Sequence, residues 1–144
     1  TIMKSKSNNP HYTDLEVVNN EYFDREYEIN ISIPEFNCLC PKSGLPDFAN
    51  IKIQYVPNKH IVELKSLKLY VIKFRGLGIF HEHVTNKIMD DFKTACKPKK
   101  IHVTGDFHPR GGIKTIISSG DKWFYLSKYN IIFDTLDGLN EKWK

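Results

Sequence analysis

The stretch NIKIQYV, residues 50–56, carries the clearest structural signal in the chain. Its two isoleucines and its tyrosine alternate with polar residues, which is typical of a strand that has one face on a protein core. Residues 28–36 show the same alternation, so we expect a second strand upstream of this one. The residues between the two strands, 37–47, contain two prolines and a glycine and are predicted to be irregular.

Two helices are predicted to follow. Apolar side chains recur at helical spacing over residues 65–75 and at every fourth position over residues 81–96. Gly76 and Gly78 separate the two helices, and Pro98 ends the second.

Two further strands are predicted at residues 101–107 and 113–117, paired antiparallel through the loop between them. The order strand, strand, helix, helix, strand, strand indicates an α+β fold, with an antiparallel four-stranded sheet and two helices on one face. The outer strands of such a sheet have open edges that invite pairing with other subunits. We therefore expect an oligomer.

The composition predicts a globular domain. The chain has 144 residues, of which 40% are hydrophobic and 26% are charged. These values exclude general disorder, a collagen-like fibre and a coiled coil. Residues 28–120 are expected to form the domain, residues 1–27 an N-terminal arm, and residues 121–144 an aromatic extension packed on the same domain.

The charge and the cysteine content indicate which ligands and which cellular location to expect. The formal net charge of +4 suits an anionic ligand, whereas scattered lysines do not favour nucleic acid. No apolar run approaches the roughly 18 residues of a membrane-spanning helix, and the polar first ten residues are not expected to be a secretory signal. Three cysteines are too few for a disulfide framework, so we expect reduced thiols and a cytoplasmic location.

The segment at residues 36–48 is the strongest candidate for chemistry. It holds Cys40 in a proline-flanked loop, with Lys42 nearby and Asp47 seven residues on. A cysteine attacks as its thiolate, which a neighbouring lysine favours, and a carboxylate can move protons to or from the intermediate. The same residues also fit a buried structural thiol, or a metal site built on Cys38 and Cys40.

The predicted first helix begins with a second candidate segment, residues 63–70. Helix N-termini bind anions through free backbone N–H groups, and Lys65 and Lys68 lie on one face, where they add positive charge. An ordinary amphipathic helix with solvated lysines fits the same pattern.

Two further segments suit polar ligands. Glu82, between His81 and His83 at the start of the second helix, can accept hydrogen bonds from a heterocycle, although it also suits the helix dipole and the histidines can ligate zinc. Arg110, followed by two glycines, can bind a phosphate, although glycine pairs are also common in hairpin turns.

Taken together and in this order, the four segments resemble those of the NADPH-dependent 7-cyano-7-deazaguanine reductases, the nitrile reductases of queuosine biosynthesis. Residues 40–48 look like the nucleophile loop of this family, and residues 63–70 fit its reductase signature. Residues 80–82 and 109–112 fall where the family has substrate and cofactor contacts. The resemblance extends from about residue 29 to residue 117.

This resemblance implies a fold and an assembly. The family has the tunnelling fold, in which antiparallel sheets of several subunits close into a barrel. The short, single-domain form is expected to stack two pentameric rings into a decamer, with active sites between subunits. A deazapurine is the implied partner, without direct contact to nucleic acid or membrane.

The resemblance also implies residue roles. Cys40 attacks the nitrile to form a covalent thioimide, Asp47 supplies the proton, and His81 lies beside the reacting group. The implied substrate contacts are Val62, Glu63, Leu64, His81 and Glu82. The implied contacts to NADPH, two molecules of which are used per turnover, are Lys65, Arg110 and Gly111. No metal is implied.

Three alternatives stay open at this stage. A tunnelling-fold amidinotransferase, which uses no NADPH, is expected to lack the signature at residues 63–70. A zinc-dependent GTP cyclohydrolase needs metal ligands, for which Cys38 and Cys40 with a histidine are candidates. A non-catalytic RNA-binding module needs a basic, aromatic surface. The absence of a glycine-rich dinucleotide loop predicts that the cofactor binds in an interface groove.

Overall fold

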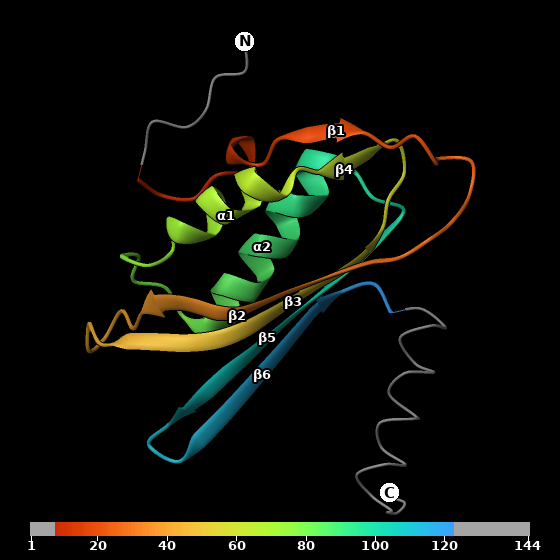
Figure 1. The fold of residues 1–144 in the computed structure, drawn as a ribbon. Helices are drawn as coiled ribbons and strands as arrows, with labels where there is room; N and C mark the ends of the chain where they lie inside the picture. Colours follow the sequence, from red (N-terminus) through yellow and green to blue (C-terminus); the bar gives the residue numbers. More distant parts are fainter. Residues whose placement is uncertain (1–7, 123–144) are drawn as a thin grey trace, which may run out of the picture.

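The alternating stretches of the sequence form one antiparallel sheet with two helices on one face (Figure 1). The structure, a computed structural model, describes residues 8–122. The elements in chain order are η1 (Tyr12–Asp14), β1 (Val17–Asn19), β2 (Ile29–Leu39), β3 (Pro46–Val56), β4 (His60–Val62), α1 (Leu64–Ile72), α2 (His81–Cys96), β5 (Lys100–Arg110) and β6 (Ile113–Gly120). The large sheet has the order β2-β3-β5-β6, and the predicted α+β arrangement is confirmed.

The core lies between the sheet and the helices. Ile51, Ile53 and Tyr55 of β3 are at most 1% exposed, whereas Lys52 between them is exposed, as the alternation predicts. The ring of Tyr55 meets that of Phe92 in α2 edge-on, with centroids 5.4 Å apart. The strand at the centre of the sheet and the longer helix therefore form the packed centre of the fold.

Gly105 of β5 lets α2 approach the sheet closely. A Cβ atom placed there would collide with Oγ1 of Thr85 in α2 and would lie 2.9 Å from Cε1 of Phe107. Glycine is required here by the distance between helix and strand.

The prediction that residues 37–47 are irregular is wrong at both ends of this segment. Asn37–Leu39 continues β2, and β3 already begins at Pro46, so the turn between them is short. The prolines misled the prediction, because a strand tolerates proline at its first residue and on a sheet edge, where no ladder hydrogen bond is lost. Pro46 occupies the first kind of position, and Pro34 in β2 occupies the second.

The other boundaries differ by a few residues. The first helix ends at Ile72, where Arg75 was predicted, and β5 and β6 extend to Arg110 and Gly120. The second helix has the predicted bounds.

The N-terminal segment contains two elements that the sequence did not indicate. Strand β1 pairs antiparallel with β4, and Leu15 between η1 and β1 is 5% exposed in the core. Three-residue elements are too short for a periodic signal, so only the structure finds them. Of the predicted extension at residues 121–144, residues 123–144 lie outside the described part, and the backbone N–H of Asp121 donates to the carbonyl of Ile101.

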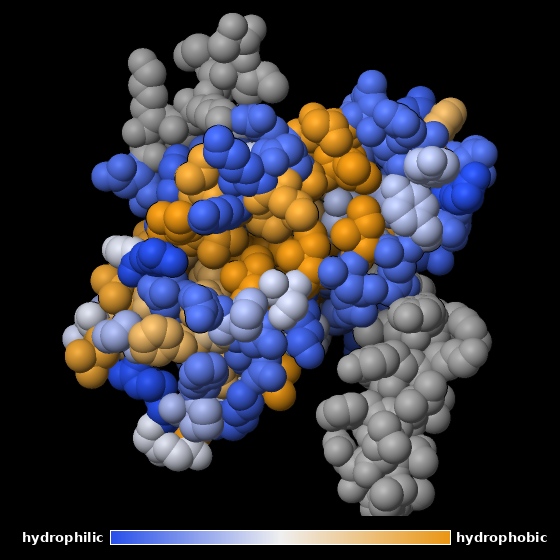
Figure 2. All heavy atoms as spheres, in the orientation of Figure 1, coloured by the Kyte–Doolittle hydropathy of each residue, from blue (hydrophilic) through white to orange (hydrophobic). Residues whose placement is uncertain are grey.

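Strands β2 and β6 are the edges of the large sheet, and neither has an outer neighbour within residues 8–122. On the helix side of the β2 edge, apolar side chains gather between α1 and β2 (Figure 2). None of the helices in the described part has the length and apolar character that crossing a membrane requires.

Substitution of Gly105 tests the packing of α2 on the sheet. Gly105→Ala is expected to lower the free energy of unfolding by about 1–3 kcal/mol, because the added methyl group overpacks the contact with Thr85. The matched control is Gly76→Ala, whose Cβ meets nothing within 4 Å and which should leave stability nearly unchanged. Urea denaturation measures both, and equal stabilities of the two variants would contradict this packing.

Candidate functional site

The turn between β2 and β3 holds Cys40 in a fixed position. The backbone N–H of Cys40 donates to Leu45 O at 2.8 Å, and the N–H of Gly44 donates to Cys40 O at 2.8 Å. Gly44 has a φ of +73°, which favours glycine. Leu39 N donates to Leu77 O at 2.9 Å and so ties the turn to the connection between the helices. Cys40 is thus carried by a braced hairpin.

The electrostatics of the thiols single out Cys40. The Ser43 hydroxyl, followed by the backbone N–H groups of Ser43 and Lys42, lowers the pKa of Cys40 below its ordinary value. Burial raises the pKa of Cys38 to about 12, with a smaller contribution from the charge of Asp47. The Cys38 side chain is fully buried, with Sγ 3.9 Å from Ile79 O, so the extra thiol is part of the core. Cys40 is the thiol suited to attack.

Asp47 lies next to this turn and has partners on both carboxylate oxygens. Its Oδ2 is 3.1 Å from Nε2 of His81, and its Oδ1 accepts a hydrogen bond from Nη1 of Arg110. The same Nη1 donates to Pro46 O at 3.1 Å. The His81 ring is stacked on Phe107 at 3.9 Å with an interplanar angle of 5°. Asp47, whose side chain is only 6% exposed, is therefore held between a histidine and an arginine.

The start of α1 forms a separate polar group. Glu63 caps the helix: its Oε1 accepts from the N–H of Ser66 at 2.8 Å and its Oε2 from the N–H of Lys65 at 2.7 Å. These backbone donors lower the pKa of Glu63. Val62 is buried, whereas Leu64 is 64% exposed.

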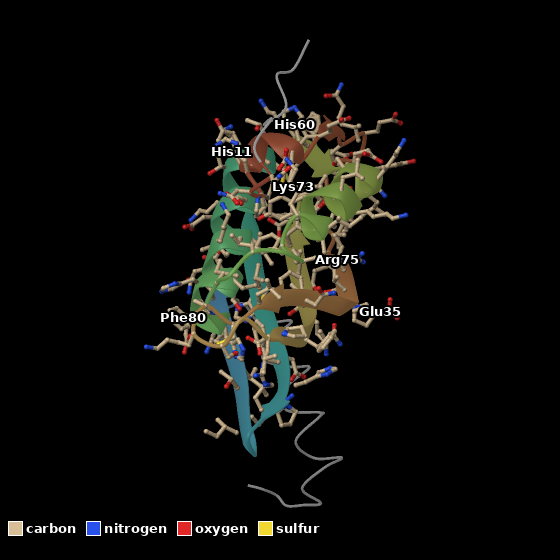
Figure 3. All side chains as sticks on the ribbon, turned by 90° about the vertical axis from the view of Figure 1, so that its left-hand side faces the viewer. His11, Glu35, His60, Lys73, Arg75 and Phe80 are labelled. Carbon is tan, nitrogen blue, oxygen red and sulfur yellow. The ribbon has the colours of Figure 1, made fainter. Side chains whose placement is uncertain are left out.

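Within one chain these two groups lie far apart. His60, two residues before Val62, lies near the top of Figure 3, and Phe80, the residue before His81, lies in its lower half. Figure 1 agrees, since β4 and the start of α2 lie at opposite ends of the helical layer. The structure brings Cys40, Asp47, His81 and Arg110 to one end of the fold. The predicted substrate contacts Val62, Glu63 and Leu64, with Lys65, stand at the other end.

The remaining predicted residues are accessible. Glu82 is exposed on the first turn of α2, beside His81. Gly111 is exposed in the β5–β6 turn, with a φ of +59°. Within residues 8–122, no three His, Cys, Asp or Glu side chains are grouped so that they could hold a metal ion.

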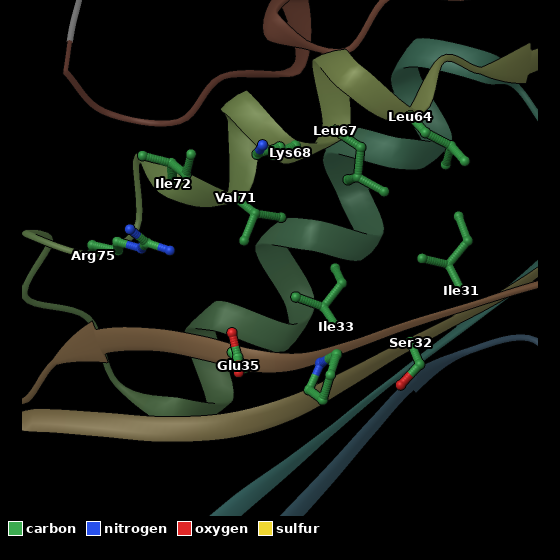
Figure 4. A pocket seen from close by; sticks show the side chains of 11 residues that line it. Ile31, Ser32, Ile33, Glu35, Leu64, Leu67, Lys68, Val71, Ile72 and Arg75 are labelled. Carbon is green, nitrogen blue, oxygen red and sulfur yellow. The ribbon is translucent and has the colours of Figure 1, made fainter.

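The fold also contains an apolar groove of about 330 Å³ between α1 and the edge strand β2 (Figure 4). Its lining residues are Ile31, Ser32, Ile33, Pro34, Glu35, Leu64, Leu67, Lys68, Val71, Ile72 and Arg75. The groove includes Leu64 of the α1 group and none of the residues around Cys40.

Sequence reasoning missed three contributors to the site: Ser43, Phe107 and the pairing of Arg110 with Asp47. The hydroxyl of Ser43 was visible in the turn, but its effect depends on the turn geometry. The other two are contacts between β5 and distant elements, for which the sequence offers no local signal.

Comparisons with known proteins agree with this fold and identify a family. A family profile described as QueF-like protein matches residues 46–122. In solved structures, the archaeosine synthase QueF-Like in its apo form aligns with a TM-score of 0.62 at 20% identity, covering 67% of this chain and 95% of that one. The fold and the matched residues thus define a QueF-like protein.

Comparison with curated relatives specifies the family within this class. The NADPH-dependent 7-cyano-7-deazaguanine reductase of Elusimicrobium minutum is 50% identical over 112 residues, 78% of this chain and 84% of the relative. The enzyme of the same name from Chloroherpeton thalassium is 52% identical over 105 residues, covering 73% and 90%, and that from Aquifex aeolicus is 53% identical over 103 residues, covering 72% and 80%. The chain belongs to the NADPH-dependent 7-cyano-7-deazaguanine reductase family, and the resemblance inferred from its sequence is confirmed.

The hydrogen bonds of Ser43 generate a test of the reactive thiol. Because these bonds stabilise the thiolate, alkylation of Cys40 by iodoacetamide should reach half its maximal rate at a pH below the ordinary thiol range. Ser43→Ala removes the largest of them and should move that midpoint to higher pH. Peptide mapping follows the rate at each cysteine. Faster alkylation of Cys38, or an unshifted midpoint in Ser43→Ala, would contradict the assignment.

Proposed function

We propose that this protein reduces the nitrile of 7-cyano-7-deazaguanine to the aminomethyl group of 7-aminomethyl-7-deazaguanine, with two NADPH, in queuosine biosynthesis. About 50% identity to reductases over about three quarters of the chain supports this activity. The observation that carries it is the position of Cys40, a thiol of lowered pKa in the same hairpin as the buried Asp47.

The first chemical step needs no cofactor. Sγ of Cys40 forms a bond to the nitrile carbon while one carbon–nitrogen π bond breaks. The nitrogen gains the proton that the thiol gives up, and we assign Asp47 to carry that proton. The product is a thioimide, which accepts hydride more readily than a nitrile does, so covalent capture replaces one difficult step by easier ones.

NADPH supplies hydride when bound: two hydrides and two protons convert the nitrile to the aminomethyl group, and the bond to Cys40 breaks again. The residues at hand fit such an anionic dinucleotide. Lys65 is exposed, and the side chain of Arg110 is 40% exposed. Gly111 and Gly112 are exposed and have no side chain, so a phosphate can approach their backbone. We assign Lys65, Arg110 and Gly111 to the cofactor.

Recognition of the deazapurine is assigned to Glu82 and Glu63, together with His81 and the residues flanking Glu63, Val62 and Leu64. A carboxylate oxygen has more than one lone pair, so Glu63 can cap α1 and still accept a hydrogen bond from the guanine-like edge. A base that lacks these donors would leave Glu82 without its partner on the base and would be rejected.

The residues around Cys40 and those around Glu63 lie at opposite ends of the fold of one chain. This separation supports an active site between subunits. If β6 of one subunit pairs with β2 of the next, the sheets continue from chain to chain and close into a barrel. We propose that the α1 group of one subunit then completes the Cys40 group of its neighbour, in a decamer of two pentameric rings. A location in the cytoplasm and the lack of direct nucleic-acid or membrane contact stay predictions.

The reductase is favoured over the alternatives. The structural likeness to an archaeosine synthase is at 20% identity and concerns the fold alone, whereas the relatives at about 50% identity are reductases. The residues that a zinc site would use have other partners, since His81 contacts Asp47 and Cys38 is buried.

The nucleophile is tested by two matched cysteine variants. Cys40→Ala should abolish the nitrile-dependent loss of NADPH absorbance, because no thioimide can form. Cys38→Ala removes a core thiol two residues away and should keep most of the activity. The assignment is wrong if the two variants behave in the opposite way.

The shared site is tested by mixing inactive subunits. Cys40→Ala and Glu63→Gln subunits, refolded together, should regain activity at about one quarter of the sites if subunits associate at random across head-to-tail interfaces. The control mixes Cys40→Ala with Asp47→Asn, which alter the same end of the fold and should regain none. Equal activity in both mixtures would refute a site assembled from two chains.

A further inference from the structure

We propose that Arg110 is a positioning residue for Asp47, in addition to the cofactor contact assigned above. The inference rests on the proposed function and adds a role in thioimide formation, which needs no cofactor. Its starting observation is that Nη1 of Arg110, at the end of β5, reaches the first two residues of β3.

The contact has two parts. Nη1 donates to Oδ1 of Asp47 and also to the backbone carbonyl of Pro46, at 3.1 Å. The carbonyl fixes the guanidinium relative to the strand that carries Asp47, so the carboxylate is held against the backbone of its own strand. A free arginine at a surface turn would show neither bond.

The other carboxylate oxygen of Asp47, Oδ2, is also held by contacts that begin at β5. Phe107, three residues before Arg110 in β5, stacks on the His81 ring at 3.9 Å, and Nε2 of this ring lies 3.1 Å from Oδ2 of Asp47. The end of β5 therefore orients both partners of the carboxylate. With two opposed partners, rotation of the carboxyl group is blocked, and a proton carrier must keep its geometry to be efficient.

Another cation of this hairpin has different partners. Lys114 of β6 bonds to Asp106 and to the carbonyl of Phe107. The Arg110 side chain is 40% exposed, so it can meet a phosphate while Nη1 keeps Asp47. One residue can thus serve the acid and the cofactor.

The test uses the absorbance of the thioimide formed from 7-cyano-7-deazaguanine with no NADPH present. Arg110→Gln should slow its formation at least about tenfold, because the carboxylate loses one of its two partners. Arg110→Lys, which retains a charged donor without the fork, should recover part of the rate. The surface variant Arg75→Gln is the control and should form the adduct at the wild-type rate. Thermal unfolding checks that each variant is folded.

A double variant tests whether Arg110 acts on adduct formation through Asp47. In the Asp47→Asn background, the further change Arg110→Gln should cause no additional slowing, because the group that it positions is already lost. Additive slowing would overturn the proposal.

The outcomes separate the two claims. Wild-type adduct formation by Arg110→Gln, with only a raised KM for NADPH, would restrict Arg110 to the cofactor and overturn this inference alone. A wild-type protein that forms no adduct would refute the proposed function, and the inference with it.

Discussion

The buried carboxylate of Asp47 is the constraint on which the site depends. A charge this far from water is tolerated only when it is paired and hydrogen-bonded. Its partners come from two other elements, His81 from the start of α2 and Arg110 from the end of β5. Pairing this carboxylate therefore fixes β3, α2 and β5 relative to one another at the end of the sheet where Cys40 lies.

Part of this arrangement could be predicted from the sequence. Alternation indicates the central strands, and helical spacing indicates α2. Cys40 and Asp47 lie in one candidate segment of the sequence, but only the structure shows the β2–β3 hairpin that makes them neighbours. The family could be recognised because four short segments, taken together and in order, resemble its motifs. Prolines near strand ends caused the main local error at residues 37–47, since their effect depends on whether the lost N–H faces a neighbouring strand.

The rest depends on contacts between distant elements. The sequence indicates that Arg110 can bind an anion. Only the structure shows that its side chain also bonds to the carboxylate of Asp47. The stacking of His81 on Phe107 and the capping role of Glu63 likewise need the structure. The separation of the Glu63 and Cys40 groups within one chain is a further structural result. It supports the proposed site between subunits, because neither end alone holds both the nucleophile and all the assigned substrate contacts.

A crystal structure of the protein after reaction with 7-cyano-7-deazaguanine, without NADPH, tests this account most directly. It should show a bond from Sγ of Cys40 to the former nitrile carbon, the nitrogen within hydrogen-bond distance of Asp47, and Glu63 of an adjacent subunit on the purine edge. A ligand seated in the groove between α1 and β2, with Cys40 unmodified, would contradict it.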